Sequence, residues 1–205
     1  MTHSWLPIFL NLSEKPVLLV GGGEVALEKL PKLYESGAHI QLVARHLKTS
    51  VLDYVASRKD RITVTVRDFE AEDVADKFLV MSATDDRQTN DWIQQLAHER
   101  HTLFNAADQA KYCDFFMTGT VKRGPLTIAI SSEGQHPGLT RAVRQFLEEM
   151  IPDTHAHALS VLTDLRLRIR DGIPSADERL LALRHLAAEM KERYLPSFRG
   201  ETHDR

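Results

Sequence analysis

The chain has 205 residues, of which 42% are hydrophobic and 27% charged, and its formal net charge is −3. This length allows one sizeable domain with an appendage, or two small domains. The near-neutral charge gives no reason to expect nucleic acid or an anionic membrane as a partner, and no apolar run approaches the length of a membrane span. The N-terminus lacks the pattern of a signal peptide, and the single cysteine, Cys113, cannot form an internal disulfide. A cytoplasmic location is therefore expected.

The first predicted elements are a strand at 17–20, a glycine turn and a helix at 24–36. Gly21, Gly23 and Ala26 match the fingerprint G-x-G-x-x-G/A of dinucleotide-binding units. Gly21 lets the chain turn sharply out of the strand, and Gly23 leaves no Cβ where a pyrophosphate must approach the backbone. The first N–H groups of the helix would then face the phosphates. A plain strand–turn–helix connection is the alternative, and the flanking strand and helix favour the cofactor site.

The predicted helix contains Pro31, which should kink the helix rather than end it early, and Gly37 is a suitable C-cap. The next strand, at 39–43, ends where NAD-binding proteins carry an acidic residue for the ribose hydroxyls of the adenosine. The sequence has Arg45 and His46 there. Arg45 could pair with the 2′-phosphate of NADP, stack on adenine, or be an ordinary surface arginine.

Three further strands are predicted at 62–66, 78–83 and 102–106, with a helix between the last two that ends near residue 100. Strands that alternate with helices indicate a mainly parallel, doubly wound sheet, which binds ligands outside the carboxyl ends of its strands. Polar side chains at strand ends are also common as turn formers and helix caps. The candidates for ligand binding at these ends are Thr84, Asp85, Asn105 and Asp108.

The pattern changes after residue 115, where strands at 116–121 and 126–131 are predicted to form a hairpin. A loop containing Ser132 then opens an amphipathic helix with Leu139 and Phe146 on its apolar face. A hairpin with one helix is too small for a core of its own. This segment is therefore expected to pack against the same segment of a second chain.

The predicted architecture has three parts. Residues 1–114 form an α/β, Rossmann-like domain with a doubly wound parallel sheet. Residues 115–151 form a β-hairpin/helix segment for dimerisation. Residues 152–205 form a small helical C-terminal domain, in which the spacing of the leucines predicts two helices.

Several motifs that occur in one order make the chain similar to a known family. They are Leu6-Pro7-Ile8-Phe9, Val20-Gly21-Gly22-Gly23-Glu24-Val25-Ala26, Ala83-Thr84-Asp85-Asp86 with Asn90, Asn105 with Asp108, and Pro125-Leu126 leading to Ser131-Ser132-x-Gly134-x-x-Pro137. On these motifs, which span roughly residues 5–150, the sequence resembles the precorrin-2 dehydrogenase/sirohydrochlorin ferrochelatase family. The resemblance is to the stand-alone dehydrogenases and to the N-terminal part of siroheme synthase.

The resemblance implies a homodimer that oxidises precorrin-2 to sirohydrochlorin with NAD, on the route to siroheme; some members also insert ferrous iron. It implies that Asp108 is the catalytic residue, and a carboxylate there could serve as the general base. The expected cofactor-binding residues are Gly21, Gly22, Gly23, Glu24, Val25, Arg45, His46, Thr84 and Asp85. The expected substrate-binding residues are Asn105, Lys111, Ser132, Arg141 and Arg144, with Lys122 and Arg123 as further candidates for the many carboxylates of precorrin-2.

The loop after the hairpin departs from the family pattern. Ser132 occupies the position of a serine that is phosphorylated in some siroheme synthases. Glu133 stands where the family has glycine, and Gln135 with His136 replaces a pair of small hydroxyl residues. These departures affect the expected shape of the loop on its substrate side.

Two other classes of protein remain as alternatives. A non-catalytic module could bind NAD or a nucleotide and signal through a dimer, since this needs the glycine turn but not Asp108. A metal chelatase could use His136 or the pair His155 and His157. However, no cluster in the sequence has convincing metal-ligand spacing.

Overall fold

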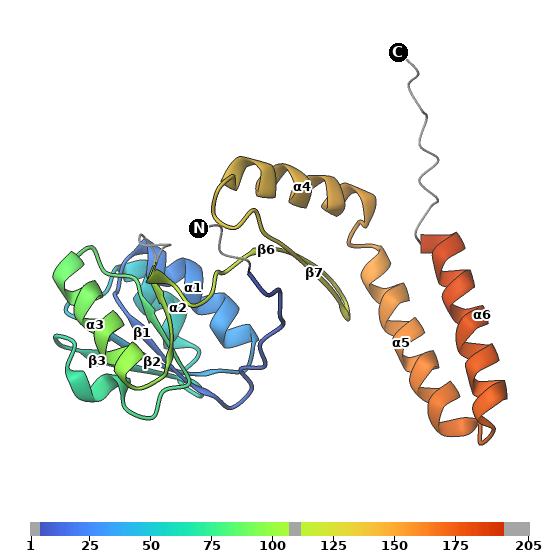
Figure 1. Ribbon diagram of the computed structural model, residues 1–205, viewed down its shortest axis with the longest axis horizontal. Coiled ribbons are helices and arrows are strands. Elements are labelled where there is room, and N and C mark those ends of the chain that lie inside the picture. The colour runs from blue at the N-terminus through green and yellow to red at the C-terminus, as the bar shows by residue number, and fades with distance from the viewer. Residues whose placement is uncertain (1–4, 107–111, 195–205) are drawn as a thin grey trace, which may run out of the picture. The chain divides into compact units, whose positions relative to one another are not determined.

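The computed structural model describes residues 5–106 and 112–194, and the chain forms two compact units, Met1–Phe116 and Met117–Arg205 (Figure 1). The first unit holds all the strands of the predicted Rossmann-like domain, and its boundary lies close to the predicted end at residue 114. The second unit contains the hairpin and the helices that follow it. A further division near residue 151 stays a prediction.

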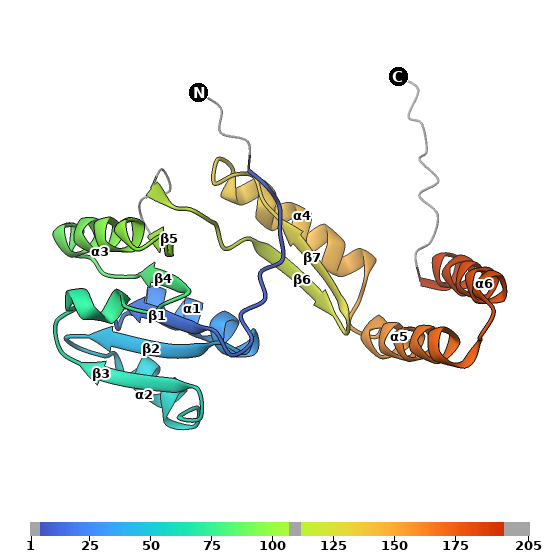
Figure 2. The same ribbon diagram turned by 60° about the horizontal axis from the view of Figure 1, so that its bottom comes forward.

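The first unit is built on a parallel sheet of five strands, as predicted (Figure 2). The sheet has the order β3-β2-β1-β4-β5, so the chain moves outward from β1 first in one direction and then in the other. Ligands of such sheets bind where the order reverses, outside the carboxyl ends of the central strands. The strands are β1 (Pro16–Val20), β2 (His39–Ala44), β3 (Ile62–Val66), β4 (Leu79–Ser82) and β5 (Leu103–Ala106).

Both faces of the sheet are covered by helices. One face, with Leu18, Val80 and Phe104, packs against Ile93 of helix α3 (Arg87–Glu99). The other face lies under helix α1 (Glu24–Glu35), which contacts helix α2 (Thr49–Ala56). Figure 1 shows α1 beside α2 and apart from α3. Strand β4 is therefore buried along its whole length, and its residues are apolar except for the last, Ser82.

Two short elements are not among those predicted from the sequence. Helix α2 buries only Val51 and Val55, which is too few apolar positions for a clear helical periodicity. The 3₁₀-helix η1 (Ala71–Val74) connects β3 to β4 and has an acidic sequence. It is fixed by buried Asp73, which accepts hydrogen bonds from Arg67 at 2.7 Å and from Gln41 at 2.8 Å.

The ends of α1 follow the prediction. The helix runs through Pro31 to Glu35 without an early end. Gly37 has φ +84°, a conformation that favours glycine, and its N–H donates to the carbonyl of Tyr34 at 3.1 Å. Gly37 therefore adopts the left-handed conformation after the end of the helix, as its place in the sequence predicted.

The described part of the second unit, which ends at residue 194, consists of an antiparallel hairpin and three helices. In the hairpin, β6 (Gly119–Arg123) pairs with β7 (Leu126–Ile130), and only two residues form the turn between them. The predicted turn at 122–125 is too long, because Gly124, at φ +56°, allows a tight two-residue turn. Helix α4 (Pro137–Met150) contacts both strands, and helices α5 (His155–Gly172) and α6 (Ala176–Tyr194) lie side by side in Figures 1 and 2.

Candidate dinucleotide-binding site

The glycine turn follows the carboxyl end of β1 and has little room for side chains. Gly21 adopts φ +123°, and a Cβ on this residue would lie 2.6 Å from the carbonyl carbon of Ala83 at the end of β4. A Cβ on Gly22 would collide with the backbone of His46. Gly23 differs from both, since a Cβ there would meet nothing within 4 Å. The turn is thus tightly packed on its inner side and open at Gly23.

The start of α1 offers unused hydrogen-bond donors. Gly23 is the N-cap residue and provides no side-chain acceptor. The carbonyl of Gly23 accepts from Leu27, but no described residue accepts a hydrogen bond from the N–H groups of Glu24, Val25 or Ala26. Open space at Gly23 and unpaired N–H groups at a helix N-terminus fit the pyrophosphate of a dinucleotide.

The loop after β2 lies against the glycine turn, where a dinucleotide fold places the adenosine. The N–H of Lys48 donates to the carbonyl of Gly22 at 2.9 Å, which fixes this contact. Arg45 and His46 are both exposed. The ammonium of Lys48 forms an ion pair with Glu24 at 3.1 Å. The structure therefore brings the predicted residues of α1 and of the β2 end together.

Arg45 forms an ion pair with Asp68, a residue that the sequence reasoning did not single out. Asp68 follows β3, and the register of the sheet sets the end of β3 beside the end of β2. The hydrogen bond that Arg45 donates to the carboxylate of Asp68 raises the pKa of Arg45, and the charges of Asp86 and Asp85 add to this effect. The acidic residue that NAD-binding proteins carry at the end of β2, about 20 residues after the fingerprint, is absent here. Asp68, which follows β3, instead brings a carboxylate to the end of β2.

The end of β4 is held by a buried amide. Asn90 of α3 is 2% exposed, and it accepts hydrogen bonds from the hydroxyls of Ser82 at 2.5 Å and Thr84 at 2.6 Å. Its Nδ2 donates to the carbonyl of Thr84 at 3.1 Å. Thr84 is therefore committed to this network, whereas Asp85 is exposed at the same edge of the sheet. Asn90 was part of the motif for the family resemblance, and the structure gives it the role of a scaffold.

Asn105, at the end of β5, is 5% exposed, and both ends of its amide are bonded. Its Nδ2 donates to the carbonyl of Phe115 at 2.9 Å, and its Oδ1 accepts from Lys29 of α1 at 3.5 Å. Burial lowers the pKa of Lys29. No carboxylate of the described residues pairs with this half-buried ammonium. Lys29 is a second residue that sequence reasoning missed, because helical periodicity gives no sign of a contact with a strand 76 residues away.

Asp108 and Lys111 lie outside the described residues, which stop at residue 106 and resume at residue 112. The predicted substrate-binding residues Ser132, Arg141 and Arg144 belong to the second unit. Ser132 contacts the hydroxyl of Thr140 at 3.0 Å and accepts from the N–H of His136 at 3.1 Å, so it stabilises the loop before α4. Arg144 pairs with Glu148 at 2.9 Å, and Arg141 is exposed.

Arg123 and Glu133, two residues of the second unit that the sequence analysis discussed, have structural roles or constraints. Arg123 is 9% exposed, and it donates to the carbonyl of Ile151 at 2.5 Å, so it anchors the hairpin to the connection between α4 and α5. Glu133 has φ +54°, a conformation that disfavours a β-carbon. This explains why glycine suits its position in the family pattern.

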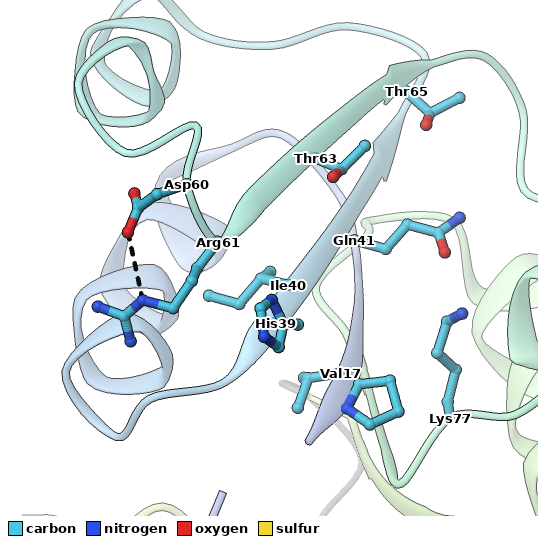
Figure 3. A pocket seen from close by; sticks show the side chains of 10 residues that line it. Val17, His39, Ile40, Gln41, Asp60, Arg61, Thr63, Thr65 and Lys77 are labelled. Carbon is cyan, nitrogen blue, oxygen red and sulfur yellow. Dashed lines mark hydrogen bonds and ion pairs between the residues drawn. The ribbon is translucent and has the colours of Figure 1, made fainter. Parts of the chain in front are cut away.

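A pocket of about 350 Å³ lies elsewhere in the first unit (Figure 3). The pocket lies over the face of the sheet that carries η1, because this short crossover covers only part of that face. None of the residues that line the pocket is a site residue predicted from the sequence. Pro16 and His39, which begin β1 and β2, place it toward the strand ends opposite the glycine turn. Its lining residues are Pro16, Val17, His39, Ile40, Gln41, Asp60, Arg61, Thr63, Thr65 and Lys77.

The described part of the chain contains neither a metal-ligand cluster nor a helix suited to span a membrane. Within it, no three histidine, cysteine, aspartate or glutamate side chains come together as ligands for a metal ion. Among the helices of that part, none combines the length and apolar composition needed to cross a bilayer.

Comparisons with known proteins agree with the site. A family model described as "Putative NAD(P)-binding" matches residues 8–119. The siroheme synthase of Zymomonas mobilis is 34% identical over 177 residues, which is 86% of this chain and 37% of that protein. Siroheme synthase 1 of Yersinia enterocolitica is 38% identical over 175 residues, which is 85% of this chain and 37% of that protein. The chain thus spans a little over a third of the length of these relatives.

A solved structure, that of SirC, precorrin-2 dehydrogenase, has a similar fold. Its TM-score is 0.79 with 23% sequence identity, and the match covers 95% of this chain and 94% of SirC. The fold predicted from the sequence, with its Rossmann-like sheet, hairpin and C-terminal helices, is confirmed. The family match likewise confirms a nicotinamide dinucleotide as the cofactor. The chain belongs to the NAD(P)-binding family that this model describes, and it is related to the siroheme synthases, as the resemblance from its motifs predicted.

Proposed function

We propose that this protein oxidises precorrin-2 to sirohydrochlorin with NAD, on the route to siroheme. The observation that carries the proposal is the open glycine turn with its unpaired helical N–H groups, in a chain that aligns with siroheme synthases over 85–86% of its length. The similarity of its fold to that of SirC, precorrin-2 dehydrogenase, supports the same activity.

The cofactor would supply a hydride acceptor, and the protein provides the binding site and the base. Gly21, Gly22 and Gly23 with the start of α1 would hold the pyrophosphate, and Arg45 and His46 in the loop after β2 would bind the adenosine part. In the sequence, Asp108 follows the last residue of β5 by two positions. We assign Asp108 as the general base that takes the proton released when the substrate loses a hydride.

Lys29 is suited to receive a carboxylate of the substrate at this edge. Its side chain is half-buried, and its ammonium donates a hydrogen bond to a neutral amide oxygen, that of Asn105. Arg45 and Lys48, by contrast, are already neutralised by Asp68 and Glu24. A desolvated cation next to a neutral partner gains most from an incoming anion.

The proposal includes a homodimer in the cytoplasm, formed through the second unit. Helix α4 has no buried residue, and Leu139 and Phe146 are 57% and 47% exposed. Exposed apolar side chains on one amphipathic helix are typical of a protein interface. A second copy that packs against α4 and the hairpin would remove this surface from water.

The experiment is to incubate the purified protein with precorrin-2 and NAD⁺, and to follow NADH formation together with the spectrum of the tetrapyrrole. Formation of one NADH per sirohydrochlorin supports the proposal. Tight NAD⁺ binding without any turnover would instead favour a nucleotide-sensing module. Sirohydrochlorin with ferrous iron, in a separate reaction without NAD⁺, tests for iron insertion.

A further inference from the structure

The pair formed by Arg45 and Asp68 lies where the adenosine ribose of a dinucleotide is bound. Arg45 directly follows β2, and in doubly wound folds the residues at this strand end contact the 2′ position of that ribose. The N–H of Arg67 donates to the carbonyl of Ala44 at 3.1 Å, which anchors the end of β3 beside the end of β2. Asp68 is thereby held next to Arg45 by the backbone of the sheet.

The surroundings of Arg45 are acidic. Besides Asp68, the charges of Asp85 and Asp86 at the exit of β4 act on its guanidinium. Asp86 is ionised in its role as N-cap of α3, because a hydrogen bond from the hydroxyl of Thr89 lowers the pKa of Asp86. The nearby Lys48 is paired with Glu24 and contributes no unbalanced positive charge.

These carboxylates have opposite consequences for the two cofactors. The 2′-phosphate of NADP carries about two negative charges near neutral pH, and it would need an unpaired arginine to bind. NAD has a 2′-hydroxyl at the same point, which can donate to a carboxylate. In the sequence alone, Arg45 suggests NADP as the cofactor. In the fold, the ion pair of Arg45 with Asp68 favours NAD instead.

We propose that Asp68 sets the preference of this protein for NAD over NADP. It keeps Arg45 in an ion pair, and its own charge opposes a 2′-phosphate. The inference rests on the proposed binding of a dinucleotide at the glycine turn, but not on precorrin-2 as the substrate.

The test is the binding of NAD⁺ and NADP⁺, measured by calorimetry without a tetrapyrrole, for the wild-type protein and for Asp68→Asn. The ratio of the two dissociation constants, that for NADP⁺ over that for NAD⁺, should fall about tenfold in Asp68→Asn. The side chains of Arg45 and Asp68 are 65% and 69% exposed, so the variant should fold, and thermal unfolding checks this. Asp68→Ser provides a second variant that also removes the charge.

Two further variants make the experiment specific. Asp60→Asn is the matched control, since Asp60 forms an exposed pair with Arg61 just before β3 (Figure 3). Asp60→Asn should leave the ratio within twofold of the wild-type value. Adding Arg45→Gln to Asp68→Asn should remove the gain in NADP⁺ binding, because the released guanidinium is then missing.

The inference is overturned if the ratio in Asp68→Asn falls by less than threefold, or if the double variant keeps the gain. Because only binding is measured, a failure to oxidise precorrin-2 would refute the proposed activity and leave this result unaffected.

Discussion

Substitution of Gly23 by aspartate should separate cofactor binding from stability, because the two effects have opposite signs. Gly23 is the N-cap of α1, its backbone is extended at φ −95°, and a Cβ would meet nothing within 4 Å. Aspartate is among the preferred N-cap residues, and its side chain could accept from the unpaired N–H groups of the first turn. We expect Gly23→Asp to raise the free energy of unfolding by roughly 0.3–1 kcal/mol, the sum of a better cap and a favourable interaction with the helix dipole.

The same carboxylate should abolish binding of NAD. It would occupy the N–H groups intended for the pyrophosphate and place a negative charge beside two phosphates. A loss of at least a hundredfold in affinity, or about 2.7 kcal/mol, is expected. Calorimetry with NAD⁺ measures the affinity, and thermal or urea unfolding of the protein without cofactor measures the stability.

Two comparisons make this prediction specific. Gly138→Asp places the same carboxylate in the first turn of α4, also in open space, and should leave NAD binding unchanged. Gly21→Ala should instead destabilise the fold by about 2–6 kcal/mol, because it combines backbone strain at φ +123° with overlap on Ala83. If Gly23→Asp binds NAD⁺ within threefold of wild type, the pyrophosphate does not approach this turn and the site is placed wrongly.

Three more predictions concern catalysis, assembly and pH. Asp108→Asn should fold and bind NAD⁺ but oxidise precorrin-2 roughly 100- to 10,000-fold more slowly, as expected for a lost general base; a rate within threefold of wild type would place the base elsewhere. Phe146→Asp should convert the dimer to monomer or aggregate in light scattering, since it puts a charge into the proposed interface, and a wild-type protein that is active as a monomer would contradict this. Burial alone would raise the pKa of Asp73, but hydrogen bonds from Arg67, the N–H of Glu70 and Gln41 hold it below the usual range. The stabilisation that Asp73 provides should thus be complete above about pH 4 and be lost as the pH falls through its lowered pKa. Urea titrations at pH 7 and at about pH 3 measure the free energy of unfolding of wild type and of Asp73→Asn. Between these two pH values, that free energy should fall less for Asp73→Asn than for the wild-type protein.

The local structure around the cofactor site is determined by the sequence itself. The fingerprint lies in the run of consecutive residues from Gly21 to Ala26, and its glycines and alanine meet backbone or size requirements that act over one turn of chain. The alternation of apolar strands and helices similarly fixes a parallel sheet, because a parallel connection needs a crossover. Even the ligand edge follows from these rules, since all the strands of a parallel sheet end on the same side.

Which side chains meet at that edge was decided only by the tertiary structure. Asp68 reaches Arg45 from 23 residues away, and Lys29 reaches Asn105 from 76 residues away. Both contacts depend on the strand order β3-β2-β1-β4-β5 and on how α1 lies over the sheet. Periodicity tells which face of an element is buried, but not which other element covers it, because many pairings bury the same apolar area. The charge of Arg45 could therefore be read from the sequence, whereas its neutralisation by Asp68 arises from the packing of β2 beside β3.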